Sequence, residues 1–478
     1  MPLGSLPSPN VALALRIQEL IAQYFYFDWG SMGNLNIEYD ITNEHSIIEY
    51  ASKLVGHSLR EVTSVEALAD HKKRRGAFGN AVEELYFKYP INSDSNPDFA
   101  EVGLELKTTP MKENKSGDLV AKERLVITMI DYNKVVNETF EDSHFLGKSS
   151  NILLMAYKYE KGANPIDYKV IFANKWNIPV EDYAQIKQDW ETVVTKIQSG
   201  HAEDISGSDT LYLEACTKAA NSSVRTTQPY SKVPAKPRAW AFKASYMTTI
   251  EKQMLGKSAS QIKRNESEKK LSLIDLLYKR FKPYFGKTED QLAAEFNISK
   301  SKDKCARITK HILGIAEDQK IEEFEKAGIK PKTIRLKSNG VPKESVSFKV
   351  FDYFKVADES FEDSDLYHDL LCKYLFVIYR ENSSGDFVLS NILLWQMPDS
   401  DLIYAEKCYL QMQNNIKAGR ADISVKASEN KCCHVRPHAR NKLDTKPQPY
   451  GKPEVKKCFW LNSSYLAEEI SKGLSFKG

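Results

Sequence analysis

The order of apolar and polar positions along the chain predicts a mixed α/β protein. Apolar residues recur at every third or fourth position over several segments, which is typical of helices. These segments are Ser46–Val55, Ala77–Phe87 and Tyr183–Gln198. Shorter apolar or alternating runs predict strands at Val102–Lys107, Arg124–Ile130, Ile152–Tyr157 and Tyr168–Ala173. We therefore expect mixed sheets flanked by helices.

The same series of motifs occurs twice. Thr139–Ser143 (TFEDS) returns as Ser360–Ser364 (SFEDS), and an apolar run of strand type follows each, at Ile152–Tyr157 and Tyr374–Tyr379. Further matches keep the same order at an offset of about 220 residues. They pair Lys196–Gly200 with Asn415–Gly419, Gln228–Tyr230 with Gln448–Tyr450, and Ser245–Tyr246 with Ser464–Tyr465. A collinear series of this kind indicates a duplicated domain.

The repeat predicts a first copy at 43–250, a linker at 251–271 and a second copy at 272–474. The polar, lysine-rich stretch Lys252–Lys270 is expected to be a solvated helix or linker. Residues 1–31 end in Gly30-Ser31 before Met32, so we interpret them as a possible tag or an unassigned segment. The length of 478 residues suits two or three domains.

The composition says more about the cellular compartment of the protein than about its binding partner. The net charge of +3 does not by itself predict a polyanionic binding partner, although a local basic surface can still bind one. The seven cysteines form no CxxC pair, which favours a reducing, cytoplasmic compartment over a disulfide framework. No apolar run approaches the ~18 residues that span a bilayer. We expect no membrane partner and no nucleotide cofactor.

Asp98, Glu105 and Lys107 form the candidate hydrolytic site, with the spacing PD-x6-ExK. Side chains alternate faces along a strand, so Leu104 and Leu106 should face the core while Glu105 and Lys107 share the other face. Asp98, on the preceding segment, can meet them. Carboxylates of this kind bind Mg²⁺, which polarises a phosphodiester, and Lys107 can orient or help deprotonate the attacking water.

The ExK pattern alone is more often found on a solvated strand face. The segment before it therefore matters, because it supports the interpretation as a hydrolytic site. Gly76–Glu83 (GAFGNAVE) predicts a helix whose glycines allow another backbone to approach closely. Glu83 would be a third carboxylate near the metal, or else a solvated helix residue with Glu84 as its rival. The basic run Lys72–Arg75 is a solvated loop or a phosphate contact, with Arg75 expected to bind DNA.

These motifs resemble the MutH-like family, which contains mismatch-repair nickases and GATC-cutting type II restriction endonucleases. The resemblance runs from about residue 43 to the C-terminus. It is carried by Gly76–Glu83, Asp98–Thr108, Lys122–Tyr132, Cys216–Asn221 and His434–His438. It implies two tandem domains of the PD-(D/E)xK restriction-endonuclease-like fold, acting on double-stranded DNA containing GATC and cutting before G. The first domain would be catalytic and the second a regulatory DNA-binding copy.

By the same resemblance Asp98, Glu105 and Lys107 take the catalytic positions. Glu83 is the accessory carboxylate, and Asp98, Glu105 and Glu83 hold Mg²⁺.

The resemblance also implies a loop in each copy that reads GATC in the major groove. Lys218 and Asn221 belong to the first loop, and Arg436 and His438 to the second. Arg436-Pro-His438 fits the family's Arg-Pro-Lys pattern, whereas the first copy has Cys216-Thr-Lys218. It stays open which first-copy side chain replaces the family arginine. Lysine can donate to guanine O6 and N7, and arginine can do so bidentately.

The second copy is predicted to have no metal-dependent catalytic activity. Aligning Phe99-x3-Gly103 with Phe324-x3-Gly328 sets Glu323, Lys330 and Lys332 at the positions of Asp98, Glu105 and Lys107, and Lys310 near that of Glu83. Two ammonium groups and one carboxylate repel Mg²⁺. A copy that keeps its reading loop and loses its catalysts is expected to be an effector site for a second GATC, coupled to the first.

Other interpretations remain at this stage. Cys432, Cys433, His434 and His438 could be zinc ligands, with the histidines at helical spacing, although Pro437 opposes a helix. A repair nickase, a non-cleaving GATC-binding regulator and a scaffold are the rival functions. The duplicated length favours restriction, and the intact Asp98, Glu105 and Lys107 set opposes the regulator. One site per chain leaves self-association on DNA, sequential nicking and pairing of the two domains all open.

Overall fold

The computed structural model describes residues 38–63, 78–88, 96–114, 116–219, 221, 223–299, 301 and 303–475. The segment 1–31, Arg75 with its basic run, and Gly76 lie outside the described residues. The chain forms two compact units. Unit 1 comprises 1–108 with 151–176, and unit 2 comprises 109–150 with 177–478. The first copy of the repeat is thus divided between both units, whereas the second lies wholly in unit 2.

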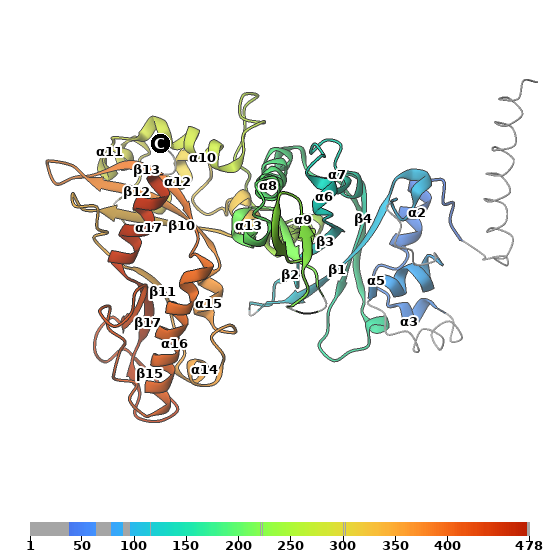
Figure 1. Ribbon diagram of the computed structural model, residues 1–478. Coiled ribbons are helices and arrows are strands. Elements are labelled where there is room, and N and C mark those ends of the chain that lie inside the picture. The colour runs from blue at the N-terminus through green and yellow to red at the C-terminus, as the bar shows by residue number, and fades with distance from the viewer. Residues whose placement is uncertain are drawn as a thin grey trace, which may run out of the picture. The chain divides into compact units, whose positions relative to one another are not determined.

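Unit 1 packs short helices against a sheet, and Figure 1 shows these helices grouped beside β4. The helices are α2 (Glu44–Ser52), α3 (Leu59–Val62) and α5 (Phe78–Ala81), and α5 continues into the π-helical turn η1 (Val82–Tyr86). Ile47, Phe78 and Val82 share one core with Leu153 and Met155 of β4, all at most 2% exposed. Burying this apolar face is what holds short helices in place.

The sheet that carries the candidate site has the strand order β2-β1-β4-β5. Its strands are β1 (Glu105–Glu113), β2 (Leu119–Ala121), β4 (Ile152–Lys158) and β5 (Val170–Trp176). The predicted strand Val102–Lys107 begins later than expected. The 3-10 turn η2 (Ala100–Val102) comes first, and Gly103 closes it in the left-handed conformation with φ 63°. Glycine reaches that conformation without steric cost.

The first-copy part of unit 2 is a three-stranded sheet of order β3-β9-β6 with helices and a hairpin. The strands are β3 (Leu125–Met129), β6 (Leu213–Thr217) and β9 (Arg238–Phe242), with the hairpin β7 (Thr226–Gln228) and β8 (Ser231–Ala235). The helices are α6 (Tyr132–Val135), α7 (His144–Ser149), α8 (Val180–Gln198) and α9 (Ala244–Met254). The helix predicted at Tyr183–Gln198 is confirmed and begins three residues earlier.

The second copy contains two three-stranded sheets, of order β10-β12-β13 and β11-β17-β14, and a small hairpin. The strands are β10 (Ile329–Leu336), β11 (Val346–Val350), β12 (Lys373–Glu381), β13 (Phe387–Trp395), β14 (Cys433–Pro437), β15 (Thr445–Lys446), β16 (Glu454–Val455) and β17 (Lys457–Leu461). The helices are α10 (Leu273–Phe281), α11 (Glu289–Glu295), α12 (Lys304–Ile312), α13 (Glu322–Ala327), α14 (Tyr353–Asp358), α15 (Asp365–Leu370), α16 (Leu402–Lys417) and α17 (Ser463–Ser475). Figure 1 shows α16 and α17 lying along these strands.

Local details recur at matching positions and confirm the duplication. Asp131 and Asp352 cap α6 and α14, each accepting two backbone hydrogen bonds. Tyr132 and Tyr353 each donate a 2.6 Å hydrogen bond to a backbone carbonyl. Gly328 takes the same φ of 63° as Gly103, just before β10. Caps and left-handed glycines are encoded locally, so both copies have kept them.

The stretch predicted as a solvated helix or linker is exposed or partly exposed over most of its length, with two buried residues. It has no regular helix between α9 and α10 and follows an irregular path. Ile262 is 2% and Glu268 3% exposed, and the backbone N–H of Ile262 donates to the Glu323 carboxylate at 3.0 Å. One apolar residue and one acidic residue thus anchor this stretch, which its polar composition did not predict. Among the described residues, no helix is long and apolar enough to cross a membrane.

Candidate active site

A tight chain reversal brings Asp98 onto strand β1. Phe99 and Leu104 exchange backbone hydrogen bonds of 2.9 and 3.2 Å around the η2 turn. The segment before the turn therefore lies against the strand after it. As a result, an Asp98 carboxylate oxygen accepts a 2.8 Å hydrogen bond from the backbone N–H of Leu106. The six residues between Asp98 and Glu105 form the turn that the motif requires.

Glu105 and Lys107 lie together on one face of β1, as predicted. The Lys107 ammonium is 2.6 Å from a Glu105 carboxylate oxygen. Leu104 and Leu106 face the other way into the core and are 0% and 4% exposed. Glu105 is itself only 3% exposed. A carboxylate this deeply buried is costly without a charged partner, which the lysine supplies.

Glu83 comes from η1 and joins the same group. Burial raises the pKa of Glu83 to about 7, the Asp98 carboxylate adds to the rise, and the Lys107 ammonium opposes it. A π-helical turn displaces side chains relative to a regular helix, and such turns are frequent at functional sites. The preceding α5 comes close to β1, since a Cβ added to Gly79 would lie 3.0 Å from the Thr108 hydroxyl.

The donor set of this group fits a hard divalent cation. Glu83, Asp98 and Glu105 offer only carboxylate oxygens, the ligands that Mg²⁺ prefers. Burial is the main cause of the raised pKa of Glu83, and the nearby carboxylates of Asp98 and Glu105 add repulsion that a bound cation would relieve. Asp98 and Glu105 meanwhile direct oxygens to the Leu106 amide and the Lys107 ammonium. In unit 1, Glu105 and Lys107 are thus in direct contact, and Asp98 and Glu105 lie close enough to Glu83 to raise its pKa.

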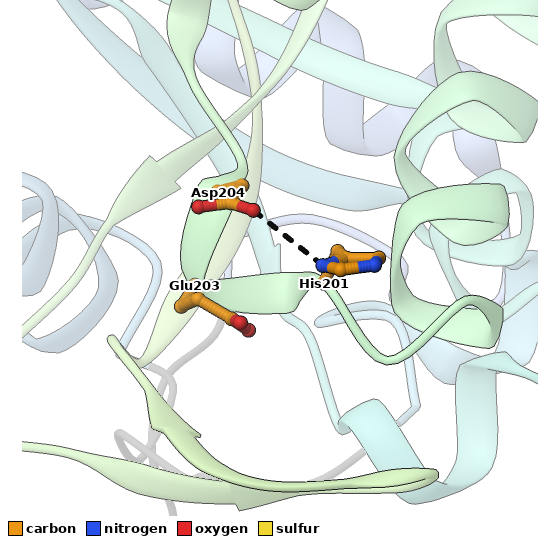
Figure 2. Close-up of side chains that lie close together, drawn as sticks. All are labelled: His201, Glu203 and Asp204. Atoms are coloured by element: carbon orange, nitrogen blue, oxygen red, sulfur yellow. Dashed lines mark ion pairs between the residues drawn. The ribbon is translucent and has the colours of Figure 1, made fainter.

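Another acidic group lies on the surface of unit 2 (Figure 2). His201, Glu203 and Asp204 have ligand atoms within 4.8 Å of one another, the only such metal-like grouping among the described residues. His201 and Asp204 are exposed and lie 3.5 Å apart as an ion pair. Glu203 accepts a 2.6 Å hydrogen bond from Gln228, which lowers the pKa of Glu203. Exposed groups of this kind are common without a metal, and nothing further marks this one as a site.

The second copy presents a different set at the positions aligned with the candidate site. Glu323, at the Asp98 position, is 6% exposed, and its carboxylate accepts a hydrogen bond from the Ile262 amide. Lys330, at the Glu105 position, pairs with Asp369 at 2.5 Å. Burial lowers the pKa of Lys332, and the neighbouring Lys330 lowers it further. Lys310 donates to the Glu317 carbonyl at 2.5 Å. No trio of acids comparable to the first copy's stands at these aligned positions.

The two loops that are predicted to read GATC follow equivalent strands. Leu213 of β6 pairs with Phe242 of β9, and Cys433 of β14 pairs with Leu461 of β17. When the two copies are aligned by this register, Cys216 corresponds to Arg436, and Lys218 corresponds to His438. Lys218 and His438 are both exposed at the strand ends. Asn221 is exposed too, and its side-chain oxygen accepts a hydrogen bond from the Ser223 hydroxyl at 2.6 Å.

Sequence reasoning missed the partner of Arg436. The Arg436 guanidinium stacks over the Trp460 ring at 3.8 Å, and the His438 ring lies 5.3 Å from the same indole. Trp460 stands on β17, and only the pairing of β14 with β17 reveals the contact. The zinc interpretation finds no support here. His434 binds Asn462 at 2.6 Å, and His438 approaches the Cys458 sulfur at 3.4 Å rather than Cys432 or Cys433.

Comparisons with known proteins agree with this geometry. A family model described as the DNA mismatch repair enzyme MutH matches residues 87–189 and 313–405, one segment in each copy. The type II restriction enzyme Sau3AI of Staphylococcus aureus is 33% identical over 88% of this chain and 96% of its own length. The DNA mismatch repair protein MutH of Serratia proteamaculans is 28% identical over 38% of this chain and 80% of its own. That of Enterobacter sp. is 27% identical over 38% and 79%.

The duplicated MutH-like fold and these matches define a site-specific deoxyribonuclease of the restriction-endonuclease type. The match to a type II restriction enzyme extends over both copies, whereas the two MutH proteins cover little more than a third of the chain. The chain belongs to the family of the type II restriction enzyme Sau3AI, as the sequence motifs predicted.

Proposed function

We propose that this protein hydrolyses both strands of double-stranded DNA at GATC, before G, with Mg²⁺ bound by Asp98, Glu105 and Glu83 of the first copy. The observation that carries the proposal is the convergence of these three carboxylates with Lys107 in unit 1. We place the reaction in the bacterial cytoplasm. The boundaries 43–250, 251–271 and 272–474 remain our proposed division of the chain into catalytic domain, linker and effector domain.

Each residue of the group has a distinct task in this proposal. A bound Mg²⁺ ion polarises the scissile phosphate and lowers the pKa of a water molecule beside it. Asp98 is held in position by the Leu106 amide, which fixes its carboxylate beside β1, where it would bind the metal. Glu105 is fixed by Lys107. The Lys107 ammonium, 20% exposed, can orient the attacking water and stabilise charge that develops on the phosphate.

The second copy is proposed to bind a second GATC without cutting it. On β10, Lys330 replaces the carboxylate of Glu105 by an ammonium and stands two residues from Lys332, so this copy offers no comparable oxygen site for a cation. Its reading strand still presents Arg436, exposed and supported by Trp460. Binding there would regulate the first copy if the two sites differ in affinity between two states of the protein. Cutting two strands with one site per chain is proposed to involve self-association on DNA.

The test is incubation of the enzyme with a plasmid that carries several GATC sequences, with Mg²⁺ and with EDTA, beside a Glu105→Gln variant. The expected result is linear fragments with 5′-GATC ends, absent with EDTA and with the variant. Accumulation of nicked circles would favour a repair-type nickase. A plasmid that stays intact but is shifted on a gel would indicate a non-cleaving DNA-binding protein and overturn the proposal.

A further inference from the structure

One question raised by the sequence concerns a missing arginine. The second copy has Arg436 on its reading strand, but Cys216 stands at the matching position of the first copy. A thiol that is 5% exposed cannot replace a guanidinium in reading a base. The first copy therefore needs its arginine from elsewhere, if it reads the same base.

Arg124 lies at that position in space. It directly precedes β3, which pairs with β9 next to β6. Its guanidinium forms a 2.8 Å ion pair with Glu214, which lies on the same face of β6 as Cys216. Burial raises the pKa of the Cys216 thiol, and the neighbouring Arg124 offsets part of that rise. Arg124 thus reaches the β6 position that arginine itself occupies on β14.

The residues around these two arginines also differ between the copies in a complementary way. By strand register, Ser345 of the second copy matches Arg124, and its hydroxyl instead contacts Ser463 at 3.0 Å. Ala241 matches Trp460, the indole on which Arg436 lies. A small side chain at this place leaves room for a guanidinium that arrives from the neighbouring strand. Each copy thus carries one arginine on this sheet face, supplied by a different strand.

Two properties suit Arg124 to contact DNA. Its side chain is 47% exposed, whereas its partner Glu214 is only 11% exposed. The ion pair engages one guanidinium nitrogen and leaves other N–H donors available. A carboxylate that fixes a long side chain in one orientation reduces the entropy lost on binding. Lys218, two residues beyond Cys216 and on the same face by strand alternation, would lie beside it on the reading surface.

We infer that Arg124, positioned by Glu214, is the first copy's guanine-reading residue and takes the role that Arg436 takes in the second copy. The inference rests on the proposed cleavage at GATC. Arginine donates two parallel hydrogen bonds to guanine O6 and N7, a contact that discriminates against other bases. A structural ion pair, or a contact to phosphate, would give no such discrimination.

The test compares cleavage of a short GATC duplex with cleavage of the same duplex carrying 7-deazaguanine, which lacks the N7 acceptor. The unmodified enzyme should lose roughly 5- to 150-fold in kcat/KM on the modified duplex, the range for one bidentate arginine–guanine contact. Arg124→Ala should cut the normal duplex less well and show no further loss on the modified one. Arg124→Lys keeps the charge beside Glu214 and should behave like Arg124→Ala. Lys218→Ala removes the other candidate donor to guanine, which follows β6, and should remain sensitive to the modification.

A second variant guards against misfolding. The double substitution Arg124→Ser with Cys216→Arg copies the arrangement of the second copy and should restore both cleavage and sensitivity to 7-deazaguanine. Equal sensitivity in the unmodified enzyme, Arg124→Ala and Arg124→Lys would overturn the inference. So would a uniform loss on every duplex with a weaker salt dependence, the mark of a phosphate contact. If the unmodified enzyme does not distinguish GATC from other sequences, the proposed function itself fails.

Discussion

Asp182 of α8 and Lys326 of α13 form a buried ion pair that joins the two copies within unit 2. Their charged atoms are 2.6 Å apart, and the side chains are 3% and 1% exposed. Glu322 also contacts the lysine at 2.8 Å, and the Tyr246 hydroxyl donates to Asp182 at 3.0 Å. Figure 1 shows α13 beside α8 and α9.

The second copy satisfies its matching aspartate internally. Asp401 accepts a hydrogen bond from Tyr465, as Asp182 does from Tyr246, but its ammonium partner is Lys431 at 2.9 Å. By strand register, the first-copy residue that corresponds to Lys431 is Leu211, which has no charge. The first copy therefore completes a buried charge with a lysine from the second. The two copies are therefore linked within unit 2 by a buried ion pair.

Replacing Lys326 by methionine should destabilise the protein strongly. Two buried carboxylates would lose their cation, and breaking a buried pair from one side costs about 3–5 kcal/mol. The double variant Asp182→Asn with Lys326→Met should recover much of this loss, since Gln261 still donates to Glu322 at 2.8 Å. Urea unfolding would measure these differences. Lys431→Met is the control, because the Lys431 side chain is 44% exposed and its loss should change the stability little.

Glu105→Gln should reduce DNA cleavage by at least about 10³-fold, because the members of a catalytic group act as a unit. The substitution removes a charge that Lys107 and a metal both require. Lys330→Gln changes the aligned residue of the second copy and should leave the cut products unchanged. Cleavage assays under single-turnover conditions compare the two. Residual cutting by the Glu105 variant would mean that the second copy is catalytic after all.

Arg436→Ala should remove the second DNA site. In a cleavage-inactive Glu105→Gln background, the chain is expected to bind two GATC duplexes, and the additional substitution should reduce this to one. Trp460→Ala should weaken the same site, since the indole supports the guanidinium at 3.8 Å. Calorimetric titration gives the stoichiometry. Arg420→Ala serves as control, because Arg420 pairs with Asp422 and is 59% exposed. An unchanged stoichiometry in the Arg436 variant would contradict the effector proposal.

Glu251 should make stability depend on pH. It is 0% exposed, and burial raises its pKa to about 8 while a 2.9 Å hydrogen bond from Thr109 opposes the rise. The unfolded chain releases this proton near its usual pKa of 4.5, whereas the folded chain keeps it. Stability therefore falls as pH rises between about 4.5 and about 8 and then levels off, by up to about 1.4 kcal/mol per pH unit.

Glu251→Gln removes this penalty. The variant should be more stable than the parent near pH 9 and should show no such advantage near pH 5, as measured by urea unfolding at both values. Glu266→Gln is a suitable control, since the Glu266 side chain is 88% exposed. A stability difference that is the same at both pH values would show that Glu251 is ionised in the folded protein.

The sequence by itself determined the parts of this protein that depend on local periodicity. Strand alternation was enough to set Glu105 and Lys107 on one face and Leu104 and Leu106 on the other. Helical spacing predicted α8, and the collinear motifs predicted the duplication. The replacement of the Glu105 carboxylate by Lys330 on β10 could also be seen by aligning the copies. These features need only neighbours along the chain, or two segments compared in order.

Only the tertiary structure decided which distant side chains meet. Lys326 reaches Asp182 across 144 positions, Trp460 supports Arg436 from another strand, and Arg124 stands beside Glu214 and Cys216. Ile262 is buried within a stretch that composition marks as solvated. Such contacts depend on the order of strands in a sheet and on how the copies pack. Neither is written in the spacing of apolar residues, because many sheet orders bury the same apolar faces.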